Sequence, residues 1–174
     1  MSTTSPNPES HRLLRIFLLA ALIAAGVPGS AFAQVNADSN QIRVGVTLGG
    51  IGLVGVAVEF RSGDNSIDVN LATFTFHDAS VSVVGKRYFG AGDARPFVGA
   101  GLWGVLGRQE SSSGKVLLLR APVGLDWRVT GNHFLGGAIS VNKALAVKRS
   151  DPDDDTPMSG RPIPLPGFYY RWQN

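Results

Sequence analysis

Apolar and polar side chains alternate along an unusually long run, KVLLLRAPVGLDWRV at residues 115–129. Successive side chains of a strand point to opposite faces, so the two alternating sets form two faces. One face is apolar from Leu117 to Val129, whereas the other carries Arg120, Asp126 and Arg128. At about 3.3 Å per residue the run exceeds a typical globular strand and suits a tilted strand that crosses a bilayer. It predicts a wall between an apolar and a polar medium.

The N-terminus predicts a signal peptide. A basic stretch with Arg12 and Arg15 precedes an apolar stretch at 16–26, and a small-x-small sequence ends at Ala33. The apolar stretch is shorter than the ~20 residues of a spanning helix, so an N-terminal membrane anchor is the weaker alternative. We expect cleavage after Ala33, which removes residues 1–33 during export.

Eight strand-like runs follow, after a short N-terminal segment at 34–40, in one domain at 41–174. They cover residues 41–48, 53–60, 66–76, 80–89, 95–108, 115–129, 133–148 and 164–172. Short Gly, Asp and Asn turns follow the second, fourth and sixth runs, whereas the connection after the seventh run is long. Short periplasmic turns and longer outer loops are typical of outer-membrane barrels. The pattern predicts an all-β fold, an eight-stranded antiparallel transmembrane up-and-down β-barrel.

Two positions predict irregularities in the sheet. The pair Val83-Val84 breaks the alternation of the fourth run, so we expect a β-bulge near Val83. Pro122 has no N–H to donate within the sixth run, so we expect a local distortion of the ladder there.

Aromatic residues gather at the strand ends that the loop pattern assigns to the periplasmic side. They are Phe60, Tyr88, Phe89, Phe97, Trp127, Tyr170 and Trp172. Barrels in the outer membrane carry aromatic girdles at both interfaces, which predicts a girdle here. An ordinary aromatic core is the alternative.

Two neighbouring segments then resemble a known group of proteins. The sequences RYFG at 87–90 and RPFVGAGL at 95–102 combine an aromatic strand end, a short Gly/Asp turn and an R-P-[FY]-V-G-x-G strand start. They resemble the periplasmic hairpin of small eight-stranded outer-membrane barrels, the OmpA/OmpX-like class. The resemblance implies an outer-membrane location, lipid as surroundings and a barrel architecture.

The last run, GFYYRW at 167–172, resembles the C-terminal signal by which such barrels are recognised by the barrel-assembly machinery. The resemblance implies this role for Gly167, Tyr170 and Trp172. The segment departs from the pattern at Leu165, where a polar residue is usual, and in the two residues after Trp172.

Charged residues recur on the faces expected to be interior. They are Arg43, Glu59, Asp68, Arg120, Asp126, Arg128 and Arg171. An eight-stranded barrel is just wide enough to be filled by its side chains. Because an unpaired buried charge is costly, we expect these residues to form a lumen charge network.

Candidate chemistry is sparse. The chain has no cysteine, and His77 and His133 have no Ser or Asp at triad spacing. Barrel enzymes that trim lipid A carry a His-x-Ser motif, and the comparable run at 139–142 lacks the histidine. The acidic loop at 151–155 lacks the glycine and glutamate of a calcium loop. We therefore predict no catalytic residue, metal or cofactor. The net charge of +3 without a basic block indicates no nucleic-acid partner.

Four cations near the expected outer rim are candidates for contacts with lipid phosphates. They are Lys143, Lys148, Arg149 and Arg161. The alternative is that they neutralise the acidic loop.

The leading hypothesis is a non-enzymatic outer-membrane barrel with a packed polar lumen, surface loops and a structural or surface-interaction role. A narrow porin-like channel for a small solute is the first alternative. A soluble periplasmic ligand-binding barrel is the second, and it would need the reverse distribution of apolar and polar faces.

Overall fold

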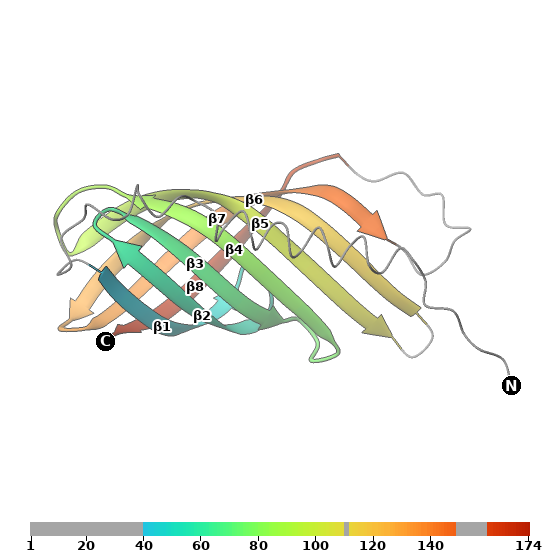
Figure 1. Cartoon of the computed structure of the whole chain (residues 1–174), viewed down its shortest axis with the longest axis horizontal. Coiled ribbons are helices and arrows are strands. Elements are labelled where there is room, and N and C mark those ends of the chain that lie inside the picture. The colour runs from blue at the N-terminus through green and yellow to red at the C-terminus, as the bar shows by residue number, and fades with distance from the viewer. Residues whose placement is uncertain (1–39, 110–111, 149–159) are drawn as a thin grey trace, which may run out of the picture. The chain divides into compact units, whose positions relative to one another are not determined.

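The computed structural model describes residues 40–109, 112–148 and 160–174 (Figure 1). In this part of the chain, eight antiparallel strands follow one another around a closed barrel, and β8 pairs with β1. The strands are β1 (Asn40–Gly49), β2 (Val54–Ser62), β3 (Asn65–Thr73), β4 (Asp78–Tyr88), β5 (Ala94–Gln109), β6 (Ser112–Thr130), β7 (His133–Lys148) and β8 (Ile163–Gln173). The predicted all-β, eight-stranded barrel is confirmed. The predicted signal peptide and the segment 34–39 lie outside the described residues.

No helix in the described ranges is long and apolar enough to cross a membrane.

The two ends of the barrel differ. The turn end has the short connections after β2, β4 and β6, where Gly63, Gly90 and Gly131 take the positive φ that such turns require. The loop end has the other four connections. Strands β5, β6 and β7, of 16, 19 and 16 residues, extend beyond their neighbours there (Figure 1).

The outer and inner faces follow the predicted alternation. On β6, Val123 and Trp127 are 55% and 53% exposed, whereas Asp126 between them is 2% exposed. Apolar side chains thus cover the outside, and charged side chains lie inside. This distribution is the reverse of that in a soluble barrel.

The third strand is shorter than predicted. β3 ends at Thr73 instead of residue 76, because the carboxylate of Asp78 accepts hydrogen bonds from the N–H groups of Phe74 and Thr75. These bonds favour a turn over further strand pairing. Phe76 at its tip has a φ of 64° and is 77% exposed.

The bulge predicted near Val83 is wrong. β4 pairs continuously with β3 and β5 through this region, and Val84 is buried on the inner face. The apolar side chain of Val84 can lie on the inner face because the lumen is not polar throughout. The register shifts on β6 instead occur between Leu117 and Leu118 and between Arg128 and Thr130, both against β7.

The expected distortion at Pro122 is present. The β5–β6 ladder runs as far as Val98–Val123 and resumes at Gly101–Arg120, so pairing is interrupted opposite the proline.

An apolar cluster fills the loop end of the lumen. It consists of Ile51, Trp103 and Leu118, all buried. The β1–β2 connection folds inward, with the Gly50 N–H donating to the Pro166 carbonyl at 2.8 Å, and this connection carries Ile51 into the lumen. The Trp103 indole N–H donates to Ser80 Oγ at 2.6 Å. The lumen is therefore apolar at the loop end and charged towards the turn end, instead of polar throughout.

Candidate functional site

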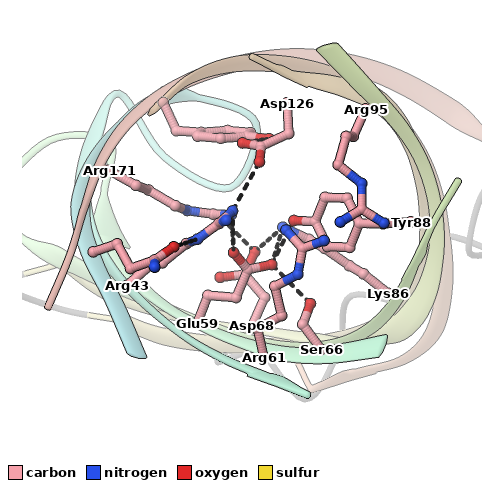
Figure 2. A network of polar contacts seen from close by, with 12 residues as sticks. Arg43, Glu59, Arg61, Ser66, Asp68, Lys86, Tyr88, Arg95, Asp126 and Arg171 are labelled. Atoms are coloured by element: carbon pink, nitrogen blue, oxygen red, sulfur yellow. Dashed lines mark hydrogen bonds and ion pairs between the residues drawn. The ribbon is translucent and has the colours of Figure 1, made fainter. Parts of the chain in front are cut away.

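Charged side chains from six strands meet inside the barrel, on the side nearer the turn end (Figure 2). We call this set the lumen charge layer. Its members are Arg43 on β1, Glu59 on β2, Asp68 on β3, Lys86 on β4, Asp126 on β6 and Arg171 on β8. Each occupies an inward position of the alternation and is at most 7% exposed. Three cations face three carboxylates, so the layer is formally neutral.

Strand pairing brings two carboxylates together. Glu59 and Asp68 are directly opposite each other on β2 and β3, an arrangement that is unfavourable without cations. Arg171 reaches across from β8 and bridges them, with Nη1 donating to Glu59 Oε2 at 3.0 Å and Nη2 to Asp68 Oδ2 at 2.8 Å. Lys86 provides a second cation, which is ion-paired with Asp68.

Glu59 is the most densely bonded carboxylate. Its Oε1 accepts hydrogen bonds from the hydroxyl groups of Ser66 and Tyr88, and its Oε2 lies 3.7 Å from Arg43 Nη1 in addition to the bond from Arg171. A buried carboxylate needs several such partners to replace its hydration. Tyr88 is therefore part of the polar network as well as of the core.

Asp126 is the third carboxylate of the lumen charge layer. It accepts a hydrogen bond from Arg43 Nη1 at 2.8 Å and another from the Tyr169 hydroxyl at 3.1 Å. The Arg43 guanidinium lies 3.7 Å from the centroid of the Phe134 ring, which is a cation–π distance. These contacts hold Arg43 between a carboxylate and an aromatic face.

Three buried aromatic rings pack beside the layer. Tyr88, Phe97 and Tyr169 are 1%, 1% and 8% exposed and form one cluster. The assignment of Tyr88 and Phe97 to an outer aromatic girdle is therefore wrong. Both residues lie near a strand end, as girdle residues do, but their side chains point into the barrel and not towards its outer surface.

The other girdle candidates lie on the outer surface near the turn end. Phe60, Phe89, Trp127, Tyr170 and Trp172 are 49%, 44%, 53%, 40% and 45% exposed. A role in anchoring the barrel at an interface stays a prediction for these five.

Glycines on the inner face make room for the large side chains. A Cβ on Gly45 would overlap the Arg171 side chain, and a Cβ on Gly136 would overlap the Tyr169 ring. Small residues opposite large ones allow the narrow lumen to close around them.

Two predicted members of the charge network lie apart from the layer. Arg120 lines a cavity of about 50 Å³ with Thr47 and Asp68, and its Nη1 has no hydrogen-bond partner among the described residues. Arg128 is exposed at the turn end, 5.5 Å from the Phe134 ring centroid, and makes no ion pair with the carboxylates of the layer. The other five predicted members are brought together.

Sequence reasoning missed Lys86. The alternation of β4 places it on the same face as Ser80, Ser82 and Tyr88, so the periodicity alone could have found it. The expected bulge near Val83 hid this signal, because a bulge reverses the faces beyond it.

The predicted assembly signal lies on β8. Gly167 pairs with Gly49 of β1 and Ala138 of β7, and Tyr170 and Trp172 point outwards. These contacts place β8 at the closure of the barrel. Recognition by assembly machinery stays a prediction.

The candidate lipid-phosphate contacts are partly described. Lys143 and Arg161 are exposed, and Lys148 ends β7. Arg149 and the acidic loop 151–155 lie outside the described residues. Binding of lipid phosphates stays a prediction.

In the described part of the chain, no group of three or more His, Cys, Asp or Glu side chains is placed to hold a metal ion. His133 hydrogen-bonds with the Tyr170 hydroxyl at 2.6 Å, and His77 contacts the Thr75 carbonyl at 3.0 Å. The chemistry that the layer offers is electrostatic pairing.

Comparison with solved structures agrees with the fold. The chain is similar to the crystal structure of the N-terminal β-barrel domain of Pseudomonas aeruginosa OprF, with a TM-score of 0.58 and 15% identity. The match covers 78% of this chain and 98% of that domain. No protein-family model matches the sequence, and no curated protein matches it significantly. The chain thus shares the fold of that β-barrel domain.

Proposed function

We propose that this chain is a non-enzymatic outer-membrane barrel that serves a structural or surface-interaction role. The observation that carries the proposal is the distribution of side chains, with an apolar outer surface and charges inside. Outward Val123, Ile139 and Phe168 are 55%, 55% and 66% exposed, which in water would be a large unfavourable apolar surface. In a bilayer the same surface contacts acyl chains, and barrel closure satisfies the backbone groups that lipid cannot.

The filled lumen supports a structural role over transport. Ile51, Trp103 and Leu118 fill the loop end, and the ion-paired lumen charge layer lies towards the turn end. The cavity lined by Arg120 measures about 50 Å³, room for a few waters but not for a passage. A narrow channel for a small solute therefore stays the second candidate.

The proposal includes outer-membrane lipid and the barrel-assembly machinery as partners. The outward aromatic residues at the turn end, Trp127 and Trp172 among them, suit an interface between lipid and water. The outward residues of β8 would be presented to the assembly machinery before the barrel closes.

Cell fractionation tests the location. We expect the mature protein in the outer-membrane fraction and its release by detergent but not by high salt or carbonate. Recovery in the soluble periplasmic fraction would contradict the proposal and favour a ligand-binding barrel. N-terminal sequencing of the recovered protein tests the cleavage after Ala33 in the same sample.

A further inference from the structure

A second hollow lies at the turn end, next to the lumen charge layer. It has a volume of about 130 Å³. We call it the arginine vestibule, because four arginines from four strands line it: Arg43, Arg61, Arg95 and Arg128. On their strands, Arg61 and Arg128 stand one inward position nearer the turns than Glu59 and Asp126.

In the described part of the chain, only two of the four arginines of the vestibule are paired with a carboxylate. Arg43 is bonded to Asp126 at 2.8 Å, and Arg95 is bonded to Asp64 at 2.5 Å. Among the described residues, neither Arg61 nor Arg128 is bonded to a carboxylate. The remaining lining carboxylate, Asp93, is solvent-exposed. Of the residues that the structure describes, four arginines and only two carboxylates, Asp93 and Asp126, line the hollow, so positive charge exceeds negative charge there.

Aromatic rings hold these arginines in place before any ligand arrives. The Arg61 guanidinium lies 4.3 Å from the Tyr88 ring centroid, and that of Arg95 lies 5.7 Å from the same centroid (Figure 2). Arg61 Nε also donates to the Gly63 carbonyl at 3.0 Å. A guanidinium that is already oriented loses little freedom when it binds an anion.

Buried donors in the vestibule lack acceptors. Arg61 is 4% exposed, and its Nη2 has no hydrogen-bond partner among the described residues. Nε of Arg95 is likewise buried without a partner there. Leaving a buried charged donor unsatisfied is unfavourable, so an anion with several oxygens would relieve it.

We propose that the arginine vestibule binds a phosphate group. Guanidinium groups on different strands approach a ligand from several directions. A tetrahedral phosphate has oxygens in several directions to accept their hydrogen bonds, whereas the two oxygens of a carboxylate lie on one side of its carbon. The volume of about 130 Å³ is several times the ~10–15 Å³ that one water needs, so the hollow has room for one such group. The group could belong to a soluble phosphate or phosphomonoester, or to the diester headgroup of a phospholipid.

Isothermal titration of the refolded barrel in a zwitterionic detergent tests the proposal, with inorganic phosphate as the probe. We expect saturable binding that Arg61→Gln weakens at least tenfold. Arg128→Gln should weaken it severalfold, and it keeps the test valid if Arg61→Gln does not fold, because Arg128 is exposed. Arg87→Gln removes the same charge from the outer face near the same end and should leave binding unchanged.

Two further titrants distinguish the sources of the phosphate. Glycerophosphoglycerol, a soluble diester, should bind at least as tightly as inorganic phosphate if the site takes lipid headgroups, and much more weakly if it takes free phosphate. Acetate should bind at least tenfold more weakly than phosphate. The proposal fails if no saturable binding occurs, if folded Arg61→Gln and Arg128→Gln both bind like the unaltered barrel, or if acetate binds as well as phosphate.

Discussion

At the scale of single residues, the lumen is governed by the cost of burying charge. Six charged side chains with little or no access to water are tolerated because each contacts an opposite charge. A buried ion pair adds little stability over an apolar pair of the same volume, but removing one partner is strongly destabilising. The layer should therefore be sensitive to single substitutions.

Asp126 and Arg43 should behave as a coupled pair. Asp126→Asn leaves the Arg43 guanidinium without its charged partner at 2.8 Å, so we expect a loss of about 3–5 kcal/mol in the free energy of unfolding. Adding Arg43→Gln should give a total loss smaller than the sum by about 0.5–3 kcal/mol. Urea unfolding of the barrel in lipid vesicles measures each value.

Arg128 supplies the control for this cycle. Although it shares the inner face of β6 with Asp126, it makes no ion pair with the layer, so Asp126→Asn and Arg128→Gln should be additive within about 0.5 kcal/mol. Additivity of Asp126→Asn with Arg43→Gln as well would mean that these charges are separately hydrated, and it would favour the channel.

Gly136 should not tolerate a side chain. Gly136→Ala places a methyl group into the Tyr169 ring, so we expect a loss of about 1–3 kcal/mol from overpacking. Gly137→Ala on the neighbouring outward position meets the edge of the Phe168 ring at 3.3 Å and the Gly167 carbonyl oxygen at 3.7 Å, and it is the matched control. Equal unfolding midpoints in urea for the two variants would contradict the packing of Tyr169 across β7.

At the scale of elements, the strand is the unit that separates the apolar outer surface from the charged interior. The outward residues of β6 are apolar from Leu117 to Val129. Pro122 interrupts the pairing of β6 with β5 without reversing the two faces. A one-residue slip would move the inward charges Arg120, Asp126 and Arg128 to the outside. The hydrophobic pattern therefore sets which face of each strand points outwards.

Val123 is predicted to face the middle of the bilayer if the proposed location is right. Val123→Arg should then destabilise the folded barrel in lipid vesicles by about 2–4 kcal/mol, because lipid does not solvate the charge. Thr130→Arg adds the same side chain at the exposed turn end of the same strand and should cost about 0–1 kcal/mol. Equal losses for both variants would show that β6 does not cross a bilayer.

At the scale of the whole molecule, two different barriers close the lumen. One is the apolar cluster of Ile51, Trp103 and Leu118, and the other is the neutral lumen charge layer. The closed barrel also leaves no free sheet edge where β1 meets β8. The described barrel thus has a filled lumen and an apolar outer surface.

A filled lumen should not conduct ions. In planar bilayers we expect no stable conductance steps from the inserted barrel. Insertion can be checked by the fluorescence of the outward residues Trp127 and Trp172, which should shift to shorter wavelength in lipid. Reproducible unitary steps from inserted protein would contradict the filled lumen and support the narrow channel.

Local pattern was sufficient for a large part of this architecture. Strand number, the inner and outer faces of β1, β2, β6 and β7, and five members of the lumen charge layer follow from side-chain alternation, which depends only on adjacent residues. The wrong predictions arose where a criterion other than side-chain alternation was used. Tyr88 and Phe97 were placed by their distance from a strand end, and Lys86 was hidden by an assumed bulge near Val83.

The partners of each charge were decided only by the tertiary structure. Arg171 bridges Glu59 and Asp68 because closure brings β8 beside β1 and its long side chain then reaches across the lumen to β2 and β3. Alternation indicates that a side chain points inwards but carries no information about the inward side chains that it meets. Those contacts depend on barrel closure, on side-chain length and on the inward path of the β1–β2 connection that buries Ile51.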